Sequence, residues 1–139
     1  MKQMRAGKCS ELIVGGHLIR HGLDVYMPSV DDKAIDFIIR AQTGRSARYY
    51  DVQVKSIRGY NRIIGVKDPA DKGSRYVLII HYRHDKKEDE FFYLTRRQID
   101  LHIIKNSTWG DLVFNRKERE LYKKQNLPHL AEQILAGKL

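Results

Sequence analysis

The sequence contains one cysteine, no long apolar run, and fewer acidic than basic residues. The single cysteine, Cys9, excludes an internal disulfide and any zinc site built from several cysteines, and it is compatible with a reducing compartment. The longest apolar runs, Leu12 to Val14 and Val77 to Ile80, are far shorter than the roughly 20 residues of a membrane-spanning helix. The N-terminal residues lack the apolar stretch and cleavage site of a signal peptide. We therefore expect a cytoplasmic protein with no membrane partner.

The shortage of acidic residues leaves a strong excess of positive charge. Lysine and arginine number 26 against 17 acidic residues, which gives a net charge of +9. Such an excess favours a polyanionic partner, because neutralising phosphates releases their counterions. Nucleic acid, most of all DNA, is the leading candidate. A basic surface that only keeps the protein soluble is the open alternative.

The length and patterning of the chain predict one α/β (α+β) domain. The 139 residues suit a single domain over 1–139, and no repeat, low-complexity tract or linker divides them. Apolar residues at helical spacing predict a first helix over 7–21: Leu12, Ile13, Leu18 and Ile19. Three strands follow it, over 23–27, 35–40 and 47–56.

The second half of the chain predicts a long loop, a hairpin and three helices. Residues 57–74 have no clear period, and we expect a loop with one short strand over 63–66. Strands over 75–83 and 90–94 form a hairpin. Thr95 and Gln98 form a capping box for a helix that Asn106 ends. A strand over 111–114 and helices over 116–124 and after Pro128 complete a central mixed β-sheet flanked by helices.

Polar residues interrupt the apolar pattern of the second and third strands. Asp36 lies in the second strand, and Gln53 and Lys55 lie in the third. Because side chains alternate along a strand, Asp51, Gln53 and Lys55 share one face, about 7 Å apart in succession. A half-buried aspartate is costly unless it is paired or bound to a metal. An Asp36–Lys55 ion pair without catalysis satisfies that demand as well as a catalytic site does.

The order of these residues along the chain is more specific than the residues themselves. A glutamate in the first helix, Glu11, precedes Asp36 and then Gln53-Val54-Lys55. Over Gly7 to Ser56 this set resembles the PD-(D/E)XK nuclease superfamily, and within it the small Holliday-junction resolvase-like and restriction-endonuclease-like proteins. The resemblance implies a restriction-endonuclease-like core, in which one helix and three strands precede further strands and helices.

The resemblance also implies a site and a reaction. Glu11, Asp36 and Gln53 would be ligands of Mg²⁺ or Mn²⁺, and Lys55 would contact the attacked phosphate or the water nucleophile. The bound metal would polarise the phosphate and lower the pKa of a water, so that a DNA phosphodiester is hydrolysed. Branched or structured DNA is the substrate implied by the resolvases, and a homodimer is the implied assembly.

Two departures from the family pattern matter. Gln53 replaces the usual acidic residue, as in Gln-x-Lys variants of the superfamily, and its carbonyl can bind a hard cation with one negative charge fewer. We therefore expect lower metal affinity, with Asp51 as a second candidate source of charge. Ile35 replaces the proline of the family name, although Asp31 and Asp32 lie just upstream.

Two further groups of residues are candidates for contact with nucleic acid. The loop after Lys55 supplies basic and aromatic side chains: Arg58, Tyr60, Arg62 and Lys67. The charged helix supplies a basic stripe at i, i+3 and i+7: Arg116, Arg119 and Lys123. Glu118 and Glu120 make an ordinary solvated face the alternative for that helix.

Two other functions remain open from the sequence. A non-catalytic nucleic-acid-binding module would keep the nuclease fold without useful metal affinity at Gln53. A protein-interaction partner would use the basic surface to meet an acidic protein. For the histidines, His17, His21, His81 and His84, we expect exposed or capping positions, because no third metal ligand accompanies any pair.

Overall fold

A computed structural model describes residues 3–28, 34–60, 63–67, 72–106 and 108–139. The helices are α1 (Gln3–Arg20), α2 (Arg96–His102), α3 (Arg116–Leu121) and α4 (Leu127–Leu135). The strands are β1 (Asp24–Tyr26), β2 (Phe37–Thr43), β3 (Ser46–Arg58), β4 (Ile64–Lys67), β5 (Tyr76–Arg83), β6 (Glu90–Thr95), β7 (Ile103–Lys105) and β8 (Trp109–Leu112). None of the described helices combines the length and the apolar character needed to cross a membrane.

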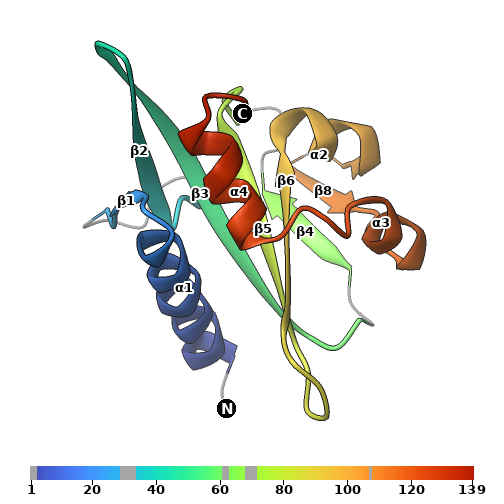
Figure 1. The fold of residues 1–139 in the computed structure, drawn as a ribbon. Coiled ribbons are helices and arrows are strands. Elements are labelled where there is room, and N and C mark those ends of the chain that lie inside the picture. The colour runs from blue at the N-terminus through green and yellow to red at the C-terminus, as the bar shows by residue number, and fades with distance from the viewer. Residues whose placement is uncertain (1–2, 29–33, 61–62, 68–71, 107) are drawn as a thin grey trace.

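The strands form a central mixed sheet and a smaller second sheet (Figure 1). The central sheet has the order β1-β2-β3-β5-β6, in which β3 and β5 are parallel and the other neighbours are antiparallel. The second sheet, in the order β4-β8-β7, is antiparallel. A mixed central sheet with flanking helices confirms the predicted fold class.

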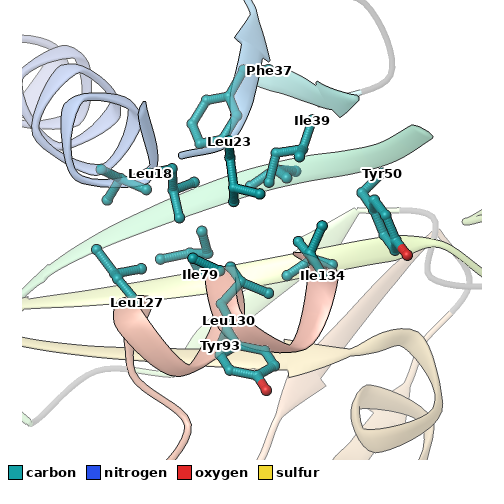
Figure 2. Close-up of a cluster of buried hydrophobic side chains, with 14 of the residues drawn as sticks. Leu18, Leu23, Phe37, Ile39, Tyr50, Ile79, Tyr93, Leu127, Leu130 and Ile134 are labelled. Carbon is teal, nitrogen blue, oxygen red and sulfur yellow. The ribbon is translucent and has the colours of Figure 1, made fainter. Parts of the chain in front are cut away.

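Two apolar cores lie on opposite faces of the central sheet. On one face α1 and α4 pack against β2, β3 and β5, with Leu18, Leu130 and Ile134 among the buried side chains (Figure 2). On the other face β5 packs against the second sheet, α2 and the α3 region. Because β5 is covered on both faces, its sequence forms a continuous apolar run and does not alternate.

The buried side of α1 includes residues that the apolar pattern did not mark. The helix begins at Gln3, and its described buried stripe contains Ala6, Ser10, Val14 and Leu18, each four residues after the last. Leu12 and Ile19, which suggested the helix, are 57% and 58% exposed. Of the apolar residues that indicated the helix, Leu18 is buried, and the small side chains of Ala6 and Ser10 belong to the same buried stripe.

The second half of the chain also departs from the prediction at its element boundaries. The capping box of Thr95 and Gln98 is present, but α2 ends at His102 and not at Asn106. The chain is extended from Ile103 onward because β7 pairs with β8. The predicted strand over 111–114 is β8, two residues earlier, and the helix predicted to continue to residue 124 ends at Leu121.

Candidate functional site

The site begins where β2 and β3 meet. Asp36 immediately precedes β2, and its backbone N–H donates to the carbonyl of Val52 at 2.8 Å. The Asp36 carboxylate accepts a hydrogen bond from the backbone N–H of Val54 at 2.6 Å. Val54 lies between Gln53 and Lys55, so the carboxylate is fixed at the same point of β3 as the two candidate residues. The structure therefore brings Asp36 and the Gln-x-Lys pair together.

Lys55 is half-buried on the face of β3 that also carries Gln53. Burial is the main cause that lowers the pKa of Lys55. The nearby Asp36 carboxylate raises this pKa and the Lys72 ammonium lowers it, each by a smaller amount. Lys55 is thus in electrostatic contact with the acid that the sequence paired with it. A partly dehydrated ammonium group interacts strongly with a phosphate, because water screens it less.

Gln53 has a partner that the sequence did not indicate. The Gln53 side chain is 7% exposed, and its carbonyl oxygen accepts a hydrogen bond from the Tyr76 hydroxyl at 2.5 Å. Tyr76 is 1% exposed, and its pKa is raised, first by burial and then by the Asp36 charge, so the hydroxyl stays protonated and donates. Tyr76 belongs to a basic and aromatic stretch that suggests surface contact. Its burial follows from the parallel pairing of β5 with β3.

Glu11 lies midway along α1 and meets Asp36 from the helix side. Glu11 and Asp36 line one cavity of about 410 Å³, with Met4, Gly7, Lys8, Met27, Pro28 and Ile35. The Lys8 ammonium donates to the Glu11 carboxylate at 3.2 Å. Gln53 and Lys55 do not line this cavity. Glu11 is therefore brought to Asp36, and Asp36 is the residue that connects Glu11 with the β3 pair.

The atoms available as metal ligands are a small number of oxygens, which are hard ligands. Among the described histidine, cysteine and acidic residues, no group of three or more is placed to hold a metal ion. The candidates are the carboxylates of Glu11 and Asp36 and the carbonyl of Gln53. Mg²⁺ commonly binds one or two carboxylates and keeps several waters, so this donor set fits Mg²⁺ or Mn²⁺ and not a metal that needs a closed cage. Asp31 and Asp32 lie outside the described residues.

The two groups predicted to contact nucleic acid meet in one place. Tyr60 and the α3 region line a pocket of about 430 Å³ with Arg116, Arg119, Lys123, Glu90, Phe92 and Glu120. The Arg119 guanidinium lies 3.8 Å from the centre of the Tyr60 ring. The Tyr60 hydroxyl donates to Glu90 and accepts from the Lys87 ammonium at 2.6 Å. Tyr60 and Arg119 are thus held inside a polar cluster.

The other described contact candidates have exposed side chains, including the two that line this pocket, Arg116 and Lys123. Arg58 and Lys67 are exposed, and Arg58 pairs with Asp85 at 3.0 Å. Arg116 and Lys123 are exposed, and Lys123 pairs with Glu120 at 2.9 Å. Arg62 lies outside the described residues.

The solvated-face alternative for α3 holds for only one of its two glutamates. Glu120 is exposed. Glu118 is 7% exposed and its carboxylate caps the start of α3, so Glu118 belongs to the fold.

The prediction for the histidines is correct for one pair and wrong for the other. His17, on α1, and His21, just after it, are exposed. His81 is 1% exposed and the His84 side chain is 8% exposed, and each bonds to a carboxylate at 2.7 Å. Their position near the end of a strand suggested exposure, but α1 and the second core cover them.

Comparisons with known proteins agree with this geometry at the level of the fold. No protein-family model matches the sequence, and no curated protein matches it. Among solved structures, a Holliday junction resolvase from the archaeal hyperthermophile Archaeoglobus fulgidus aligns with a TM-score of 0.54 at 10% identity, over 91% of this chain and 95% of the resolvase. A bacterial homing endonuclease aligns with a TM-score of 0.56 at 15% identity, over 99% of this chain and 95% of the endonuclease. The chain has the restriction-endonuclease-like fold of PD-(D/E)XK-type nucleases.

Proposed function

We propose that this protein is a metal-dependent endonuclease that hydrolyses phosphodiester bonds of DNA. The observation that carries the proposal is the Asp36 carboxylate, which is bonded to the backbone of β3 between Gln53 and Lys55. This arrangement occurs in a fold shared with two nucleases. The net charge of +9 suits a polyanionic substrate.

Each residue of the site has a distinct task in this reaction. Glu11 and Asp36 supply negative oxygen ligands, and Gln53 supplies a neutral one that Tyr76 holds in place. Mg²⁺, when bound, supplies positive charge that polarises the phosphate and acidifies a water. Lys55 donates hydrogen bonds to the oxygens on which negative charge develops during attack. Its partial burial strengthens that interaction.

Branched DNA is the substrate we propose, with a homodimer as the active assembly. The similarity to a Holliday junction resolvase supports this choice. Cutting two strands symmetrically requires two sites, which a pair of these chains would provide.

The test is cleavage of labelled duplex, single-stranded and four-way-junction DNA with Mg²⁺, Mn²⁺ or EDTA. We expect metal-dependent products for the wild type and a loss of at least about 100-fold for Lys55→Ala. Asp36→Asn should lose cleavage while keeping an oxygen that accepts from Val54. Lys105→Ala, an exposed lysine of β7, is the matched control and should cleave normally. Normal cleavage by Lys55→Ala or Asp36→Asn would show that the site assignment is wrong.

A specific observation favours one other candidate, a non-catalytic DNA-binding module. The Gln53 oxygen already has a donor in Tyr76, and the cavity beside the site is lined by two carboxylates, those of Glu11 and Asp36. That module would bind the same DNA in EDTA and in every metal without producing cleaved strands.

A further inference from the structure

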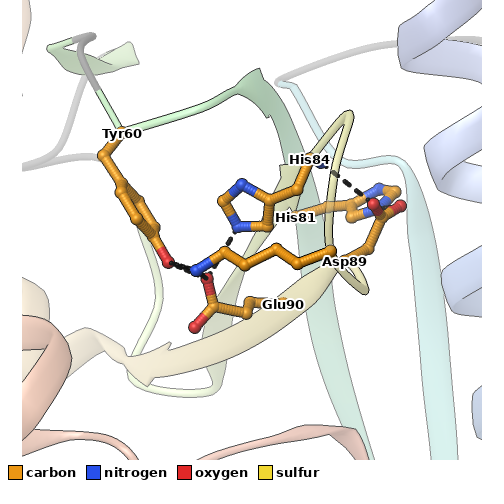
Figure 3. Close-up of polar contacts among 6 residues, drawn as sticks. Tyr60, His81, His84, Asp89 and Glu90 are labelled. Atoms are coloured by element: carbon orange, nitrogen blue, oxygen red, sulfur yellow. Dashed lines mark hydrogen bonds and ion pairs between the residues drawn. The ribbon is translucent and has the colours of Figure 1, made fainter.

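Three polar side chains connect α1 with the hairpin of β5 and β6. The Ser10 hydroxyl and Nδ1 of His81 are 2.7 Å apart, although the residues are 71 positions apart in sequence. Nε2 of His81 lies 2.7 Å from the Asp89 carboxylate. The other oxygen of that carboxylate accepts from the backbone N–H of His84 at 3.1 Å (Figure 3). Ser10 and His81 are each 1% exposed.

The direction of each hydrogen bond follows from the chemistry of the partners. The Asp89 carboxylate can only accept, so Nε2 of His81 carries the proton. Burial, the largest influence, lowers the pKa of His81, which keeps the ring neutral at neutral pH. Nδ1 is then an acceptor, and the Ser10 hydroxyl donates to it. The Phe91 ring stacks on the imidazole at a centroid distance of 4.4 Å and fixes its plane.

Burial excludes a nucleophilic function for this serine, histidine and aspartate. A serine that is 1% exposed cannot reach a substrate, whatever base lies beside it. The role left for the three residues is structural: their hydrogen bonds attach α1 to the hairpin.

The start of α1 has few other attachments to the sheet. The described buried side chains of its first half are those of Ala6 and Ser10, which are small, whereas Val14 and Leu18 anchor the second half. Small side chains bury little apolar area, so they hold a helix weakly. A buried hydrogen bond fixes the position of a helix more precisely than such apolar contacts do, because its geometry is directional and no water is there to replace either partner. The bond from Ser10 to His81 is thus the specific attachment of the helix segment that precedes Val14.

Glu11 follows Ser10 directly and lines the cavity that contains Asp36. We propose that Ser10 and His81 are positioning residues, which hold the first half of α1 so that the Glu11 carboxylate reaches a divalent cation shared with Asp36. The inference rests on the proposed function, because it assumes that Glu11 and Asp36 bind this cation.

The test measures Mn²⁺ binding to the full chain without DNA by isothermal titration calorimetry, together with urea unfolding. Ser10→Ala removes the hydroxyl and favours the helix, and we expect about tenfold weaker Mn²⁺ binding. Ser10→Cys keeps the size of the side chain and should weaken binding similarly, which covers the case in which the alanine variant does not fold. Val14→Ala, one turn further along the same buried stripe, is the matched control. It should lose stability and keep the wild-type Mn²⁺ affinity.

The outcomes separate this inference from the proposed function. If the wild type binds Mn²⁺ and the two Ser10 variants bind it equally well, the positioning inference is wrong and the proposed function stands. Equal weakening in Val14→Ala would also overturn it, because any loosening of α1 would then suffice. If the wild type binds no Mn²⁺, the proposed metal site fails, and no ligand remains to be positioned.

Discussion

Gln53 is the residue at which the candidate site departs from the acidic pattern of the PD-(D/E)XK nucleases, whose fold the chain shares. Its carbonyl oxygen accepts from Tyr76, and Asp36, immediately before the neighbouring strand β2, accepts from the backbone N–H of the next residue, Val54. A carboxylate at this position would accept the same hydrogen bond and would add one negative charge. Under the proposed function, this position would therefore tune the metal affinity while keeping the hydrogen bond from Tyr76.

We predict that Gln53→Glu binds Mn²⁺ more tightly than the wild type, because a hard cation is attracted by each added carboxylate. The dissociation constant from calorimetry checks this directly. Gln42→Glu adds the same charge at an exposed position of β2 and should leave the affinity unchanged. A Gln53→Glu protein with wild-type affinity would show that Gln53 is not a ligand.

At this scale the sequence predicted the catalytic candidates but not the residues that hold them. The alternation of β3 placed Gln53 and Lys55 on one face, and the structure agrees. Tyr76 could not be predicted as the partner of Gln53, because that contact depends on the register in which Tyr76 lies opposite Asp51. A parallel register between distant strands leaves no local pattern in the sequence.

Among the elements, the ends of the β5 and β6 strands were predicted closely, but the burial of the His81 side chain on β5 was not. The β-forming residues and the charged turn between them gave both strands within one residue of their ends. The burial of His81 depends on α1 lying over the hairpin, which is a long-range contact. The boundary between α2 and β7 was missed for the same reason, since pairing with β8 overrides the local helical preference after His102.

We predict that the free energy of unfolding falls as the pH decreases from 7 to 5.5, in part because of His81. Burial lowers the folded pKa of His81 most strongly, Asp89 opposes this, and Arg83 and His17 lower it further. The unfolded chain then binds more protons than the native one below pH 6.5, so acid favours unfolding. Urea unfolding at both pH values should show a smaller decrease for His81→Gln. An equal decrease in both proteins would assign the pH dependence to other groups.

The whole molecule carries its positive charge on many exposed side chains of several elements. The pocket between Tyr60 and α3 gathers some of them, and Arg116 is exposed beside it. The net charge predicts an anionic partner, but it cannot say where a phosphate would lie.

We predict that DNA binding in EDTA weakens linearly with salt on a double-logarithmic plot, because each neutralised phosphate releases counterions. Arg116→Ala should reduce the slope by about 1 if this arginine contacts a phosphate. Fluorescence anisotropy with a labelled junction gives the slope. Lys105→Ala should keep the wild-type slope, and an unchanged slope in Arg116→Ala would place the DNA elsewhere.

The parallel pairing of β3 and β5 also has a consequence during synthesis of the chain. The contact of Asp36 with β3 forms within one hairpin, whose strands are joined by a few residues. The Tyr76 hydroxyl reaches Gln53 only after the chain has crossed from β3 to β5, and such non-local pairings form slowly. A nascent chain that ends before β5 therefore lacks the hydroxyl that orients the Gln53 amide. Under the proposed function, such a ribosome-bound chain would have no complete metal site.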